Sequence, residues 1–147
     1  MRLRFPHGTL LALAASLVAS ACSAGALERL RGHTYPPSFR YIPREELRSA
    51  MWRLADGSAR LDRLMRASAG GDEALQGWVI RELQGMESAA AELGPEGWPS
   101  NHPRVSRHID RFRQDLADAR HAAELDPPGY FLAGSVSGAC MHCHEGE

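Results

Sequence analysis

The amino-acid sequence predicts an all-α fold, arranged as an antiparallel four-helix bundle. Apolar residues recur every three or four positions in four stretches between residues 43 and 144, which is the period of helices with one buried face. No stretch shows the alternation of apolar and polar residues that is typical of a half-buried strand. The links between the stretches are short, and short links favour helices that lie antiparallel beside their neighbours.

The first predicted helix covers residues 43–66 and the second covers residues 72–93. Pro43 suits a first-turn position, because its missing N–H is not needed there. Gly70-Gly71 separates the two helices, and Gly94-Pro95 ends the second. Their apolar stripes are Leu47, Met51, Leu54, Ser58, Leu61 and Met65 in the first, and Leu75, Val79, Leu83, Met86, Ala90 and Leu93 in the second.

The third predicted helix begins near Pro103 and ends before Pro127, and the fourth begins near Pro128 and continues to His144. Three glycines weaken the fourth as an isolated helix. The stripes are Val105, Ile109, Phe112, Leu116, Ala119 and Ala123 in the third, and Phe131, Leu132, Val136, Cys140, Cys143 and His144 in the fourth.

Residues 1–21 are predicted to be a secretory signal peptide. Arg2 and Arg4 give a short positive region, residues 10–18 are apolar, and small residues precede a cleavage point. The sequence Ala19-Ser20-Ala21-Cys22 resembles a bacterial lipobox, which predicts a lipidated Cys22 at the new N-terminus. The alternative is ordinary cleavage that leaves a soluble protein. We expect a periplasmic protein that is tethered to a membrane by its lipid.

The rest of the chain divides into a tether and a helical domain. Residues 22–42 show no helical period and contain Pro36-Pro37, so we interpret them as the tether. Residues 43–147 form the domain. A chain of 147 residues with a formal charge of −1 suits one small domain and offers no basic excess for nucleic acid. No nucleophile–base set or carboxylate pair stands out, so we do not expect an enzyme.

The C-terminal sequence Cys140-Met141-His142-Cys143-His144 reads C-x-x-C-H, the attachment motif of c-type haem. Two thiols can add to the vinyl groups of a haem, and the histidine can bind the iron as the proximal ligand. On a helix, positions i, i+3 and i+4 share one face, so all three side chains can meet one porphyrin. The predicted cofactor is therefore one covalently attached haem c, carried by the C-terminal helix.

The same five residues would also fit a chance match, a redox dithiol or half of a zinc site. A thioredoxin-like dithiol lies near a βαβ pattern, which this sequence lacks, and a zinc site requires further ligands although no other cysteine pair exists. The export signal supports haem, because it directs the chain to the compartment where such haem is attached. Haem uses two of the three cysteines, and a lipid at Cys22 would use the third.

Three residues could bind the other face of the iron if the helices alternate in direction. Met51 and Met86 lie at similar heights on the first two helices, and His108 lies near the start of the third, while Met65 lies too far along. Each also fits a simpler role: methionines commonly fill cores, and His108 could be a partly buried surface histidine. Helix geometry alone does not choose among them.

The chain from residue 43 onward resembles the class II c-type cytochromes, the family of cytochrome c′ and cytochrome c-556. The resemblance rests on the four-helix layout, on the stretch Arg48-Ser49-Ala50-Met51-Trp52-Arg53-Leu54, and on the ending Gly138-Ala139-Cys140-Met141-His142-Cys143-His144. It implies a four-helix bundle with haem near the C-terminus. It also implies that Met51 is the sixth iron ligand, as in the low-spin members, whereas cytochrome c′ has an apolar residue there and a five-coordinate iron.

Three functions follow as hypotheses. The first is a single-haem cytochrome that transfers electrons on the outer face of the cytoplasmic membrane, with His144 and Met51 as iron ligands and unidentified redox proteins as partners. The second is a five-coordinate protein that binds nitric oxide or carbon monoxide. The third is a haem-free helical lipoprotein for protein interaction. A homodimer is compatible with each of them, because bundles of this kind often pair.

Overall fold

The structure is a computed structural model that describes residues 27, 30, 34–67 and 73–144 of the 147-residue chain. It divides into two units, residues 1–39 and 40–147, which are treated separately. The predicted signal peptide and Cys22 lie outside the described residues, as do residues 23–26, 28–29 and 31–33 of the predicted tether. In the first unit, the rings of Tyr35 and Phe39 stack with their centroids 4.2 Å apart.

The second unit is built from helices. They are α3 (Arg44–Ala67), α4 (Glu73–Ala91), α5 (Pro103–Glu124), α6 (Phe131–Ala139) and the single turn α7 (Met141–His144). Over residues 34–67 and 73–144 the chain forms no strand, and its one β-bridge joins Arg40 to Ser100. The all-α prediction is confirmed, and the first three predicted helices are found within one to two residues of most of their expected limits.

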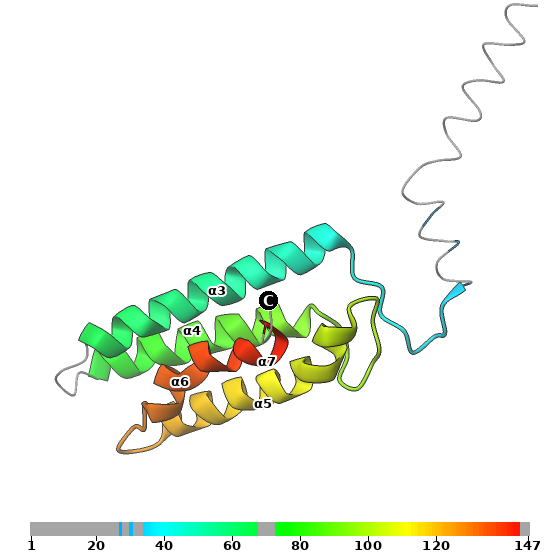
Figure 1. Ribbon diagram of the computed structural model, residues 1–147. Helices are drawn as coiled ribbons and strands as arrows, with labels where there is room; N and C mark the ends of the chain where they lie inside the picture. The colour runs from blue at the N-terminus through cyan, green and yellow to red at the C-terminus, as the bar shows by residue number, and fades with distance from the viewer. Residues whose placement is uncertain (1–26, 28–29, 31–33, 68–72, 145–147) are drawn as a thin grey trace, which may run out of the picture. The chain divides into compact units, whose positions relative to one another are not determined.

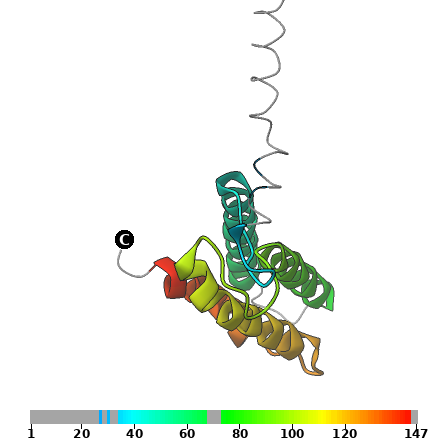
Figure 2. The same ribbon diagram turned by 90° about the vertical axis from the view of Figure 1, so that its right-hand side faces the viewer.

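α3 packs against α4, α4 against α5, and α5 against α6. In addition, α6 packs against α3, and α7 packs against α5. From α3 to α6, successive helices run in opposite directions (Figure 1), and an end view shows α3, α4, α5 and the C-terminal helices around a common centre (Figure 2). These are the contacts that an up-and-down arrangement of helices requires. The core contains most of the predicted stripe residues: Leu54, Leu61, Leu75, Val79, Leu83, Met86, Ala90, Leu93, Val105, Ile109, Phe112, Leu116, Ala119, Ala123 and Val136.

The α3–α4 contact is close because a glycine lies in it. A Cβ atom added to Gly57 would lie 2.7 Å from Cγ of Met86 and 3.1 Å from its sulfur. Met86 is 1 % exposed, so its thioether occupies the space that a larger residue at position 57 would need. Ion pairs reinforce the same side: Arg53 Nη1 lies 2.6 Å from Glu92 Oε1, and Arg60 Nε lies 2.7 Å from Glu82 Oε2.

The prediction of one continuous fourth helix from residue 128 to residue 144 is wrong. The chain after α5 folds back first, since the backbone N–H of Gly129 donates to the carbonyl of Ala122 at 2.8 Å. Consecutive prolines at 127 and 128 cannot donate backbone hydrogen bonds, and Pro128 disfavours a helical conformation of the residue before it. The helix therefore begins at Phe131, and it is interrupted at Cys140, between α6 and α7.

Residues 40–42, which the sequence assigned to the tether, belong to the second unit. Ile42 is fully buried, and the side chain of Asn101 bonds both of its backbone groups: Oδ1 accepts from the Ile42 N–H at 2.7 Å, and Nδ2 donates to the Ile42 carbonyl at 3.0 Å. The Arg40 N–H donates to the Pro99 carbonyl at 2.9 Å. The entry to α3 is thus fixed to the start of α5. In the described ranges, no helix combines the length and the apolar character needed to cross a membrane.

Candidate functional site

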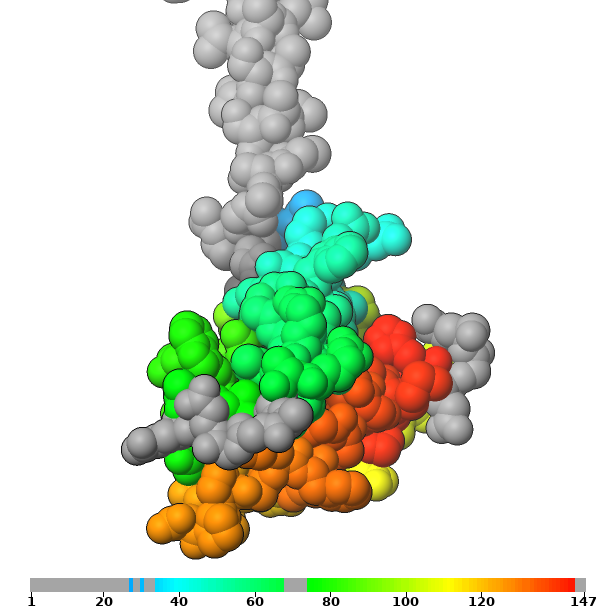
Figure 3. All heavy atoms as spheres, turned by 90° about the vertical axis from the view of Figure 1, so that its left-hand side faces the viewer, coloured from blue at the N-terminus to red at the C-terminus, as the bar shows by residue number. Residues whose placement is uncertain are grey.

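A cavity of about 440 Å³ lies between α3, α5 and the C-terminal helices. Its volume falls within the range of roughly 300–1,000 Å³ that is usual for small-molecule and cofactor sites. The space-filling view shows α6 and α7, coloured orange to red, against the side of α3 (Figure 3). Most of the wall is apolar, and the lining residues are Arg48, Met51, Trp52, Leu54, Ala55, Val105, Ile109, Phe112, Ala139, Cys140, Cys143 and His144.

The three chemically active residues of the C-x-x-C-H motif line this one cavity together. Although α6 ends at Ala139, Cys140 keeps helical backbone angles of φ −58° and ψ −28°. The backbone N–H groups of Cys143 and His144 donate to the Cys140 carbonyl at 3.3 and 3.2 Å. The motif is therefore one helical turn, and its positions i, i+3 and i+4 point into the same space.

The two residues inside the motif take other positions. Met141 is 54 % exposed, and it does not line the cavity. The Nε2 atom of His142 lies 3.6 Å from Oδ2 of Asp115 on α5, so this histidine faces a neighbouring helix. His144 is therefore the motif histidine that the turn places at the cavity.

Both motif thiols are half-buried, and their surroundings favour the neutral form. Burial raises the pKa of the Cys140 thiol above its ordinary value. Burial also raises the pKa of the Cys143 thiol, with a further contribution from Cys140 beside it. Dithiol redox centres show the opposite shift, because their attacking cysteine is stabilised as a thiolate.

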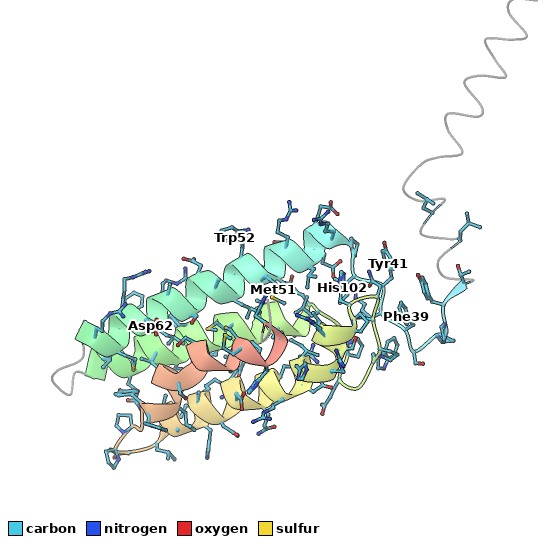
Figure 4. All side chains as sticks on the ribbon, in the orientation of Figure 1. Phe39, Tyr41, Met51, Trp52, Asp62 and His102 are labelled. Carbon is cyan, nitrogen blue, oxygen red and sulfur yellow. The ribbon has the colours of Figure 1, made fainter. Side chains whose placement is uncertain are left out.

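The structure separates the three candidates for the second axial position. Met51 is partly buried on α3 and lines the cavity with Cys140, Cys143 and His144. Figure 4 shows it on the side of α3 that faces α7. Met86 is buried in the core against Gly57, and neither it nor His108 is among the residues that line the cavity.

Sequence reasoning missed the polar residues around the cavity. Arg48 and Trp52 line it from the solvent side of α3, and Trp52 is 71 % exposed. A smaller recess of about 290 Å³ adjoins the cavity, because both are lined by Met51, Val105, Cys143 and His144. Asn101, His102 and Arg104 line this recess. Asn101 and His102 precede α5, and Arg104 lies in its first turn. The spacing of apolar residues therefore does not predict which side chains these three residues contact.

The small residues of α6 explain why this side of the domain is hollow. The helix reads Phe-Leu-Ala-Gly-Ser-Val-Ser-Gly-Ala, and only Ala133 and Val136 are buried. Small side chains leave unfilled volume where the other helices contribute leucine, isoleucine or phenylalanine. From α6, Ala139 lines the cavity, and Cys140, Cys143 and His144 complete that wall.

The described ranges contain no group of three or more His, Cys, Asp or Glu side chains that could hold a metal ion by themselves. The chain matches no protein-family model, no curated protein and no solved structure.

Proposed function

We propose that the chain is a single-haem c-type cytochrome that transfers electrons on the outer face of the cytoplasmic membrane. One observation carries the proposal: Cys140, Cys143 and His144 line one apolar cavity, with Met51 on its wall. The resemblance of the sequence to class II c-type cytochromes supports the same function, as does the packing of the helices, which suits a four-helix bundle.

The residues at the cavity fit a haem c. Cys140 and Cys143 would hold it by thioether bonds, His144 would be the proximal iron ligand, and Met51 would be the distal ligand. The porphyrin itself supplies four nitrogen ligands, so a haem iron needs no cluster of three protein side chains. Bound there, the haem would supply reversible one-electron chemistry at its iron.

The protein's own contribution would be to hold the cofactor, choose its axial ligands and limit the access of water. Leu54, Ile109 and Phe112 give the cavity an apolar wall. A thioether ligand and an apolar surround both favour the ferrous form and so raise the reduction potential. The raised pKa values of the two half-buried thiols argue against a dithiol redox centre, in which the attacking cysteine is stabilised as a thiolate.

A five-coordinate protein that binds nitric oxide or carbon monoxide is the second candidate. Its support is that Leu54 and Ala55, which also line the cavity from α3, carry no atom that could bind iron. If the Met51 sulfur does not bind the iron, the distal side is an apolar chamber that suits a small neutral gas. The two candidates differ only in whether that sulfur is a ligand.

The proposed location follows from the N-terminus. A signal peptide over residues 1–21 would export the chain, and lipidation of Cys22 would tether it at a membrane. Redox proteins on the same side of the membrane would then be its partners, and a homodimer is compatible with this arrangement.

The test is the optical spectrum of the protein made in a host with haem-attachment machinery. We expect a red protein whose reduced spectrum is low-spin and does not change with carbon monoxide. A high-spin spectrum that shifts with the gas would favour the second candidate. A colourless protein would contradict both and would favour the haem-free lipoprotein.

A further inference from the structure

The cavity and its recess together are polar at one end only. At one end lie Arg48 on α3 and Arg104 on α5, with Asn101 and His102 beside Arg104. At the other end the lining residues are Leu54, Ala55, Ile109, Phe112 and Ala139, which carry no polar side-chain atoms.

Helix geometry places the two arginines at the same end. The helices α3 and α5 run in the same direction (Figure 1). Arg48 and Ala55 are separated by about 10 Å along α3, at roughly 1.5 Å per residue, and Arg104 and Phe112 are separated by about 12 Å along α5. His102, the residue directly before α5, also lies at this end (Figure 4).

Arg48 differs from the other arginines of α3 that face neighbouring elements. Arg53 is paired with Glu92, and Arg60 is paired with Asp56 and Glu82. Among the residues that the structure describes, Arg48 forms no ion pair. A guanidinium at the edge of an apolar cavity, with no carboxylate partner in the described ranges, is placed to bind an anion that enters the cavity.

His102 and Asn101 form a fixed polar border rather than additional ligands. The Nε2 atom of His102 lies 3.0 Å from the Ile42 carbonyl, and Asn101 bonds both backbone groups of Ile42. These bonds hold the start of α5 against the entry to α3. They therefore fix the backbone from which Arg104 projects, at the polar end of the recess.

We propose that Arg48 and Arg104 bind the carboxylate groups of the cofactor, and so determine which edge of the macrocycle lies at the polar end. This inference rests on the proposed function. A c-type haem is amphipathic: its two vinyl groups bond to cysteines, and its two propionates lie on the other side of the ring. Cys140 lines the cavity but not the recess, and Arg104 lines the recess but not the cavity, so the thioether at this cysteine and Arg104 occupy different parts of the site.

The experiment compares holoprotein variants Arg48→Gln and Arg104→Gln with Arg63→Gln and Arg111→Gln. The control arginines lie on the same two helices, are exposed and do not line the cavity or the recess. We expect both test variants to shift the propionate bending mode in the resonance Raman spectrum and to lower the midpoint potential. An uncompensated carboxylate near the iron favours the ferric form. The control variants should leave both readings at their wild-type values.

A second variant separates charge from structure. Arg48→Lys keeps the positive charge, so its potential should lie closer to wild type than that of Arg48→Gln. If the test variants match the controls in both readings, the inference is overturned while the proposed function stands. If the wild-type protein carries no haem, the proposed function and this inference both fail.

Discussion

The two sides of α3 carry apolar residues at the same helical spacing, but one side packs into the core and the other lines the cavity. On the side facing α4, Gly57 lets Met86 approach so closely that a Cβ atom added at position 57 would lie 2.7 Å from Met86 Cγ, and Met86 is buried. On the side facing α7, Met51 and Leu54 line a cavity of about 440 Å³. Both sides carry apolar residues at helical spacing, so the difference lies in the partner helix.

The partner on the closed side is α4, which has 19 residues and contributes Val79, Leu83 and Met86 to the core. The partner on the open side is α6 followed by α7, with 9 and 4 residues, most of them small. A short helix of small residues cannot fill the space that a long helix with leucines fills. Apolar residues therefore face each other across a gap that suits a ligand.

The largest expected effect is the loss of the cofactor when the motif is removed. A Cys140→Ser/Cys143→Ser variant should lose all covalently bound haem, because no thiol remains at the cavity. The pyridine haemochrome assay on denatured protein measures this. Cys22→Ser is the matched control, and it should keep a full complement of haem. Covalent haem in the double variant would contradict the proposed role of these cysteines.

The next prediction compares the stability cost of a core truncation on the closed side of α3, which faces α4, with one on the open side, which faces α7. In the haem-free double variant, Leu83→Ala should cost about 2–5 kcal/mol in the free energy of unfolding, since it opens a cavity in a filled core. Leu54→Ala should cost near the lower end of that range, about 2 kcal/mol, because Leu54 already borders an open space. Urea denaturation measures both. Equal losses would mean that the open side is as well packed as the closed side.

A matched pair of methionine variants sharpens the same comparison spectroscopically. Met51→Leu should convert a low-spin spectrum to a high-spin one, because leucine has no donor atom. Met86→Leu should leave the spectrum unchanged and cost less than about 1.5 kcal/mol, as volume-conserving changes in a core do. If the spectrum is unchanged in both variants, Met51 is not an iron ligand and only packs in the domain, which would favour gas binding.

The smallest effect concerns the ion pairs on the closed side. Hydrogen bonds from Arg53 hold the pKa of Glu92 below its ordinary value of 4.5. The pair's contribution to stability is therefore fully present above the unfolded pKa, and it is lost as the pH falls through the lower folded pKa. Glu92→Gln should reduce the melting temperature slightly at pH 7 and have no effect at strongly acidic pH. If the melting temperatures of Glu92→Gln and wild type differ more at acidic pH than at pH 7, the ion pair with Arg53 does not stabilise the fold as described.

The sequence alone determined the all-α fold and most of the core. Residues such as Leu83, Leu116 and Ala119 recur at a period that only a helix can bury on one side, and each is fully buried. The sequence also identified Cys140, Cys143 and His144 as one unit, because their spacing fixes their common face within a single turn. Local periodicity is sufficient for both results.

Tertiary packing decided the rest. Met51 and Met86 are equivalent in sequence pattern, yet one lines the cavity and the other fills the α3–α4 contact, because side chains on other helices determine the free volume around each. The recess likewise joins Leu47 to Asn101 and His102, residues more than fifty positions apart. A sequence pattern reports which face of a helix is apolar, but only the packed helices fix what that face meets.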